Sequence, residues 1–184
     1  QVSSTVPIVM VAPDPVGSGF AESLARPGKN VTGIAFMDIE LTAKRLDLLR
    51  RIVPTLTRIA LLWNPDGSGV AGADFVTSAA GRIGIQTVAI EVNDAERLSQ
   101  AVARARAHGA QAVLPMSSTF FNRNRKPLAE ALQSQRMPAS CEMGLLVAEG
   151  GCLMSYGADY LALFARIAYF VDRILKGAKP GELP

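Results

Sequence analysis

The single histidine of this sequence, His108, is its most obvious candidate for proton transfer. It precedes Gly109 at the expected end of a helix, where an imidazole interacts favourably with the helix dipole. That structural role explains His108 better than general base catalysis does. With His108 at a helix end, a Ser-His-Asp or Cys-His arrangement has no obvious base. No cluster of Cys and His has the spacing of zinc ligands, and the sequence predicts neither a metal ion nor a cofactor.

The two cysteines, Cys141 and Cys152, offer a second kind of chemistry. They could form a disulfide only if the fold brings them together. Both lie in apolar surroundings, which favours buried free thiols over a disulfide.

Phosphate-binding motifs are incomplete. Gly17-Ser18-Gly19 follows a predicted strand, but a dinucleotide fingerprint needs a glycine or another small residue where Glu22 stands. A carboxylate at that point would repel a pyrophosphate, and no P-loop sequence is present. Two carboxylates, Asp14 and Glu142, both follow predicted strands. They keep an α/β enzyme open as a less favoured interpretation.

The elements that must position these residues alternate along the chain. Short β-branched runs predict strands at residues 6–12, 31–36, 58–63, 86–92, 110–115, 137–142 and 152–156. Longer amphipathic runs predict helices at residues 14–24, 38–52, 71–83, 93–108, 122–135 and 160–175, with loops at 64–69 and 117–121. This alternation is typical of right-handed βαβ units. The predicted fold class is therefore α/β, with Rossmann-like, mostly parallel sheets flanked by helices.

Ligands of parallel sheets bind beyond the carboxyl ends of the strands. This rule selects polar residues at the predicted strand ends as ligand-binding candidates: Asp14, Asn64, Ser117, Ser118, Glu142 and Tyr156. Phe120 joins them because an aromatic ring in a strand-end loop could stack on a ligand. Packing of both Phe120 and Phe121 in the core is an equal alternative. For the polar residues the alternative is a helix cap or a loop hydrogen bond, most clearly for Asp14.

Composition and charge narrow the class of protein. A chain of 184 residues with 49% hydrophobic residues can build a sizeable core. The net charge of +3 is spread over helix faces without interleaved aromatic residues, so no nucleic-acid partner is expected. No run reaches the roughly 18 apolar residues of a membrane span. The chain also opens without a secretory signal, although a mature chain would lack one too.

Seven stretches, in this order, resemble the ABC-transporter substrate-binding family related to tryptophan- and tyrosine-type importers. They are DPVGSG at 14–19, ARPGKNVTG at 25–33, KRLDLL at 44–49, LWNP at 62–65, FFN at 120–122, LMSYG at 153–157 and RILKGAKP at 173–180. The resemblance runs from about Thr5 to Pro184. The order of the motifs is specific, although each motif alone is weak.

The resemblance implies a type I periplasmic-binding-protein architecture, with two α/β lobes joined by a hinge and the ligand between them. By this comparison the chain holds one complete lobe and part of the other. Residues 1–30 and 157–184 would belong to lobe one, and residues 31–156 to lobe two, with hinge crossings near 30–33 and 155–157.

The implied function is capture of a small-molecule solute, such as an amino acid or a small aromatic compound, with no chemical step. The implied partner is an ABC permease in the membrane. The expected location is periplasmic or otherwise extracytoplasmic and membrane-associated, with a signal peptide upstream. The stretch 140–146 is less aromatic and less charged than in many relatives, so the resemblance does not transfer the identity of the ligand.

Two other functions stay open. The same fold serves as the ligand-sensing core of transcriptional regulators, whose DNA-binding segment would lie upstream of this chain. An α/β enzyme would need Asp14 and Glu142 to converge with a third polar group. A fragment of this kind would also leave the apolar helix at 160–175 without its partners, which predicts self-association.

Overall fold

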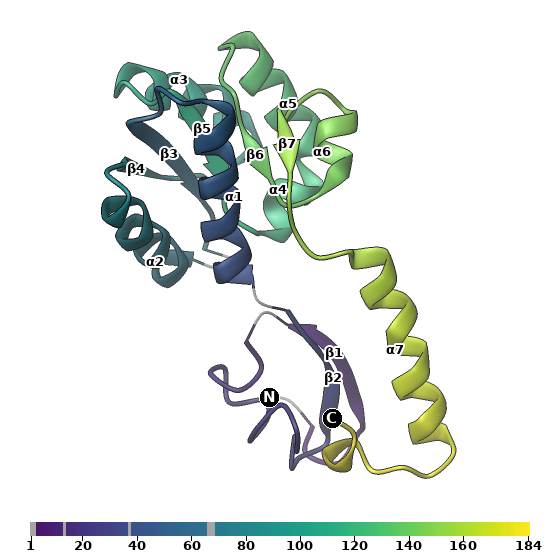
Figure 1. Ribbon diagram of the computed structural model, residues 1–184. Coiled ribbons are helices and arrows are strands. Elements are labelled where there is room, and N and C mark those ends of the chain that lie inside the picture. The colour runs from purple at the N-terminus through teal and green to yellow at the C-terminus, as the bar shows by residue number, and fades with distance from the viewer. Residues whose placement is uncertain (1–2, 13, 37, 66–68) are drawn as a thin grey trace. The chain divides into compact units, whose positions relative to one another are not determined.

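The computed structural model describes residues 3–12, 14–36, 38–65 and 69–184 (Figure 1). The chain divides into two compact units, unit 1 with residues 1–37 and 158–184 and unit 2 with residues 38–157. The sequence placed the first boundary and the first hinge crossing near residue 30. Residues 31–35 instead form a strand that pairs inside unit 1, and the division comes after residue 37. That these units are the lobes of a larger binding protein stays a prediction.

Unit 2 is built on parallel strands. Strands β3 (Arg58–Trp63), β4 (Gln86–Glu91) and β5 (Ala112–Pro115) form a sheet in the order β4-β3-β5. A second parallel pair, β6 (Ser140–Cys141) and β7 (Met154–Ser155), lies next to β5, to which the bridge Val113–Ala139 connects it. The expected α/β fold with parallel sheets is confirmed.

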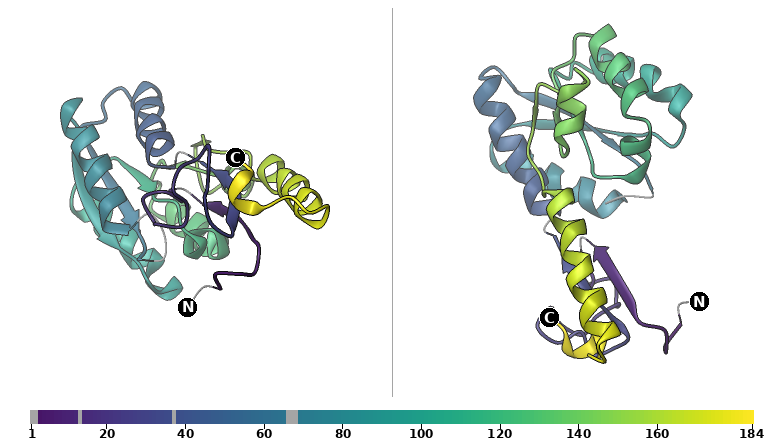
Figure 2. Two further views of the ribbon diagram at one scale, coloured as in Figure 1. Left: turned by 90° about the horizontal axis from the view of Figure 1, so that it is seen from below. Right: turned by 90° about the vertical axis from the view of Figure 1, so that its right-hand side faces the viewer.

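The two faces of this sheet bury two separate cores. Side chains alternate along a strand, so Ile59 and Leu61 of β3 pack on one face and Ala60 and Leu62 on the other. Helices α1 (Asp38–Ile52) and α2 (Gly69–Arg82) cover the first face. The second face is covered by α3 (Leu98–Ala107) and α5 (Arg125–Ser134) (Figure 2). The short helix η1 (Ala95–Arg97) precedes α3. A strand covered on both faces is apolar throughout, which is why β3 is so clear in the sequence.

Unit 1 contains the parallel strands β1 (Ile8–Ala12) and β2 (Val31–Ala35), with Ile8 beside Val31. Helix α7 (Tyr160–Leu175) packs on both strands, and the short helix η2 (Pro180–Glu182) lies against β2. The hydroxyl of Thr32 donates a hydrogen bond of 2.6 Å to the carbonyl of Leu183. Of the α7 side chains, Phe170 is buried, whereas Leu161 is 84% and Leu175 is 81% exposed.

Two local predictions from the sequence are wrong. The helix predicted at residues 14–24 is a series of turns, in which the Asp14 carboxylate accepts a hydrogen bond of 2.8 Å from the Gly17 amide. Gly19 has a φ of 73°, a left-handed conformation that ends any helix there. The loop predicted at 117–121 becomes helix α4 (Thr119–Arg123), whose N-cap is Ser118. A further helix, α6 (Gly144–Ala148), was not predicted.

The expectation of free thiols is also wrong, because Cys141 and Cys152 form a disulfide with a Cα–Cα distance of 6.0 Å. Cys141 ends β6 and Cys152 lies two residues before β7, so the parallel pairing of β6 with β7 brings the two cysteines within reach although eleven positions separate them. Among the described residues, no helix is both long and apolar enough to cross a membrane.

Candidate functional site

The carboxyl ends of β3, β5 and β6 bring four of the predicted site residues together in unit 2. Asn64 follows β3, Ser117 and Ser118 follow β5, and Glu142 follows β6. Because the strands are parallel, these ends share one edge of the sheets.

Glu142 is the charged centre of this group, and its side chain is only 8% exposed. One carboxylate oxygen accepts a hydrogen bond from the Ser117 hydroxyl, and the other accepts one of 3.0 Å from the side-chain amide of Asn122. A carboxylate is a group with which a cation or a hydrogen-bond donor pairs.

Asn64 and Ser118 hold the surrounding loops in place. Asn64 is 3% exposed, and its amide donates a hydrogen bond of 2.7 Å to the carbonyl of Val92. The Ser118 hydroxyl lies 3.4 Å from the side-chain oxygen of Asn64 and also accepts a hydrogen bond of 3.0 Å from the Phe120 amide. Ser118 therefore begins helix α4, which carries Asn122 toward Glu142.

A cavity of about 290 Å³ lies against Asn122, the residue that donates a hydrogen bond to this carboxylate. Its wall has a polar side on α4 and α5 and an apolar side on α6 and the residue before it: Thr119, Asn122, Arg123, Arg125, Met143, Leu145 and Leu146. Asn122 belongs both to this wall and to the hydrogen bonds of Glu142. The cavity thus has arginines on one side and aliphatic groups on the other, and Asn122 connects it to the Glu142 carboxylate.

The two arginines of the cavity differ. Arg125 donates a hydrogen bond of 2.9 Å to the Glu149 carboxylate and is held in place by this ion pair. Arg123 is exposed at the end of α4. An exposed guanidinium beside the cavity can bind a carboxylate in a bidentate manner.

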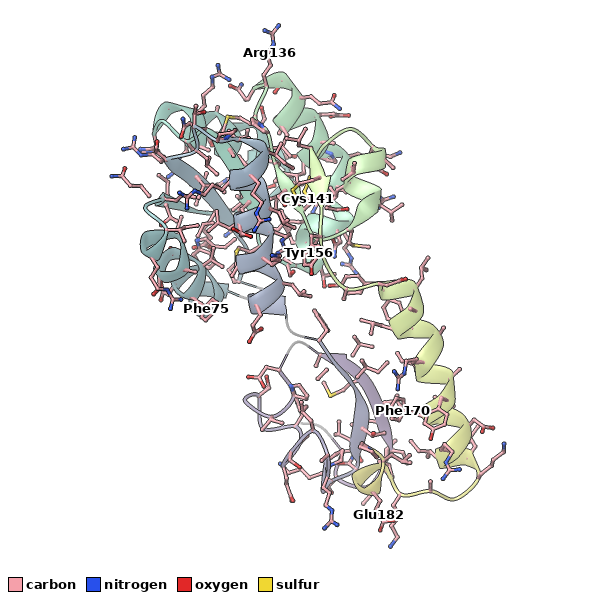
Figure 3. All side chains as sticks on the ribbon, viewed as in Figure 1. Phe75, Arg136, Cys141, Tyr156, Phe170 and Glu182 are labelled. Atoms are coloured by element: carbon pink, nitrogen blue, oxygen red, sulfur yellow. A yellow bond between two sulfur atoms is a disulfide. The ribbon has the colours of Figure 1, made fainter. Side chains whose placement is uncertain are left out.

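The structure gives the remaining predicted residues local contacts. The backbone amide of Tyr156 donates a hydrogen bond of 3.0 Å to the carbonyl of Cys141. The carbonyl of Tyr156 accepts one of 3.4 Å from the Arg45 guanidinium. Tyr156 is 41% exposed. Cys141 lies on β6 and Tyr156 just beyond β7, and the two residues are close to one another (Figure 3).

The other two predicted residues also have local contacts. Phe120 packs on the core, and its ring centre lies 5.3 Å from that of Phe121. Asp14 lies in unit 1, where it closes the turn at Gly17.

Sequence reasoning missed Asn122 and Arg123. The sequence does contain a sign of Asn122. It follows Ser118 by one helical turn and therefore lies on the same side of a helix that begins at Ser118. The sequence instead placed the helix start at Asn122, which hid this relation. No group of His, Cys, Asp and Glu within the described residues could hold a metal ion.

One protein family matches this chain over its whole length. The model of the family described as ABC transporter substrate binding protein matches residues 1–184. The tyrosine-binding protein of Clostridioides difficile is 23% identical over the whole chain, which spans 53% of that protein. The chain thus spans about half the length of this curated relative.

Solved structures show the same fold. A conserved domain protein from Vibrio cholerae is 26% identical, with a TM-score of 0.88 over 98% of this chain and 60% of that one. An ABC domain in complex with L-Trp from Streptococcus pneumonia is 21% identical, with a TM-score of 0.85 over 99% of this chain and 61% of that one. Both likenesses extend over nearly all of this chain.

Proposed function

Because the chain belongs to the ABC transporter substrate-binding protein family, we propose that it takes part in solute capture for import and that its solute is an amino acid. The family is one of binding proteins, the class expected from the sequence. The single observation that carries the choice of ligand is the buried carboxylate of Glu142, held by Ser117 and by Asn122, which itself lines a cavity.

An α-ammonium group fits this carboxylate. A carboxylate and an ammonium carry opposite charges, and an ammonium offers three hydrogen-bond donors. Arg123 would donate hydrogen bonds to the α-carboxylate, and the aliphatic wall of Met143, Leu145 and Leu146 would contact the side chain. A cavity of about 290 Å³ lies at the lower end of ligand pockets. It therefore suits a single amino acid better than a peptide.

The names of two similar proteins support an aromatic amino acid. One is called a tyrosine-binding protein, and the other was solved in complex with L-Trp. In this proposal Met143 and Leu145 pack against the ring, since sulfur and aliphatic groups both contact aromatic rings favourably.

The proposal includes no chemical step and places the protein outside the cytoplasm, where it would deliver the solute to a membrane permease. The disulfide between Cys141 and Cys152 supports this location, because disulfides persist in oxidising compartments.

The test is a calorimetric titration of this chain with L-tyrosine, L-tryptophan and their analogues. We expect an amino acid to bind at least about tenfold more tightly than its analogue without the amine, such as 3-(4-hydroxyphenyl)propanoate, a difference of about 1.4 kcal/mol or more. Equal binding of the two, or no binding of any amino acid, would contradict the proposal.

We also expect this chain to self-associate through α7. Leu161, Phe164, Val171 and Leu175 follow one another at helical spacing and are 84%, 57%, 40% and 81% exposed. An apolar stripe with this spacing suits packing against the same stripe of a second copy. Light scattering should give the mass of a dimer, and Leu161→Lys with Leu175→Lys should restore the monomer. A monomer at every concentration tested would show that α7 is not an interface.

A further inference from the structure

The disulfide encloses the segment that carries the apolar wall of the cavity. Cys141 immediately precedes Glu142, and Met143, Leu145 and Leu146 all lie between Cys141 and Cys152. The bond therefore closes a loop that begins at the carboxylate, contains α6 and returns to β7. The other wall of the cavity lies on α4 and α5, outside this loop.

Besides the disulfide, two side-chain contacts tie this loop to α5: the Arg125–Glu149 ion pair at 2.9 Å and the hydrogen bond of 3.0 Å that the Gln133 amide donates to the Gly150 carbonyl. The secondary-structure elements of the loop are themselves short. Strands β6 and β7 have two residues each, and α6 has five. Within the loop, the carbonyl of Leu146 accepts hydrogen bonds from the amides of Gly151 and Cys152, at 2.9 and 3.0 Å. Elements this short open locally at low cost unless something else fixes them.

We propose that the disulfide between Cys141 and Cys152 is a positioning element of the ligand site. It holds the loop at both ends and so fixes the Glu142 carboxylate and the aliphatic wall against Asn122 and Ser117. As a ligand-site element it rests on the proposed function. Cys141 is fully buried and Cys152 is 6% exposed, so reductants reach the bond slowly. A disulfide of this kind is expected to resist exchange.

The first test needs no ligand. Hydrogen–deuterium exchange is compared between wild type, Cys141→Ala, Cys152→Ala and the double variant. We expect exchange in peptides covering residues 142–151 to be faster by about tenfold or more, while β3 at residues 58–63 keeps its protection. Unchanged exchange at 142–151, or a uniform increase across unit 2, would overturn the proposal.

The single variants distinguish the effect of losing the covalent bond from the effect of losing the packing of each sulfur atom. Loss of either cysteine breaks the same bond, so each single variant should match the double variant. Two independent packing defects would instead add. Additive effects would assign the result to packing and count against the proposal.

Should the alanine variants not fold, wild-type protein treated with dithiothreitol gives the same comparison. The reagent supplies two electrons and two protons, becomes its own cyclic disulfide and leaves two protein thiols. Faster exchange confined to residues 142–151 after this reduction is again the expected result. Exchange that does not change, once thiol titration shows that the bond is open, contradicts the proposal.

A second readout uses L-tyrosine and L-tryptophan as probes. For whichever binds wild type, we expect the dissociation constant to rise about tenfold in all three variants, because the wall must be ordered again on binding. Unchanged affinity with a lowered unfolding temperature would leave the bond a stabilising role only and overturn the positioning role. If neither amino acid binds wild type, the proposed function fails, while the exchange experiment still decides whether the bond orders this loop.

Discussion

Glu142→Gln is expected to weaken the binding of an aromatic amino acid by about 100-fold, a loss of about 2.7 kcal/mol. Glutamine has the shape of glutamate and can still accept a hydrogen bond from Asn122 and exchange one with Ser117. The substitution therefore removes the charge and keeps the local contacts. An ammonium loses its counter-ion in a site that is 8% exposed, where water replaces little of that interaction.

The matched control is Glu130→Gln, which removes the same charge from an exposed position on α5. It should leave the affinity unchanged, so a general effect of net charge is separated from a local one. Isothermal titration measures affinity, and thermal unfolding checks that both variants fold. Tight binding by Glu142→Gln would show that the carboxylate does not contact the ligand.

Much of the fold follows from strong local patterns. The limits of β3 and α7, residues 58–63 and 160–175, agree with their predicted ranges. The strand is apolar on both faces, and the helix combines many apolar residues with an N-cap at Asp159. The turns at 14–24 were mistaken for a helix because Asp14-Pro15 is a good helix start. The glycines at 17 and 19 outweigh that signal.

The site was partly visible in the sequence. The strand-end rule selected Asn64, Ser117, Ser118 and Glu142, and the structure joins them through direct hydrogen bonds or through Asn122. Asn122 was hidden because its side chain matters only once α4 is known to begin at Ser118. Their contact with a ligand stays a prediction.

The disulfide and α6 escaped prediction for a different reason. Both depend on the pairing of β6 with β7, a tertiary contact between residues 140–141 and 154–155. Neither strand is longer than two residues, so no periodicity marks them. Helix α6 also lacks a side-chain cap at Met143, the usual sign of a helix start.

Gly157→Ala is expected to displace the Glu142 carboxylate by crowding the backbone of Glu142. A β-carbon built on Gly157 would lie 2.4 Å from the carbonyl oxygen of Glu142 and 3.1 Å from its carbonyl carbon. These atoms belong to the backbone, so a side-chain rotation cannot relieve the clash. Either residue 157 or the backbone of Glu142 must move, and overpacking of this kind costs about 1–3 kcal/mol.

The matched control is Gly144→Ala at the start of α6, where an added β-carbon would meet the Ser155 hydroxyl at 3.8 Å, an ordinary contact. Urea unfolding should show a lower free energy of unfolding for Gly157→Ala and little change for Gly144→Ala. Titration should show weaker binding by about tenfold or more for the first variant, because a displaced Glu142 loses its alignment with Asn122 and Ser117. If Gly157→Ala lowers stability but binds as wild type does, the shift is taken up by residue 157 itself. In that case the position of Glu142 does not depend on the close approach of this glycine.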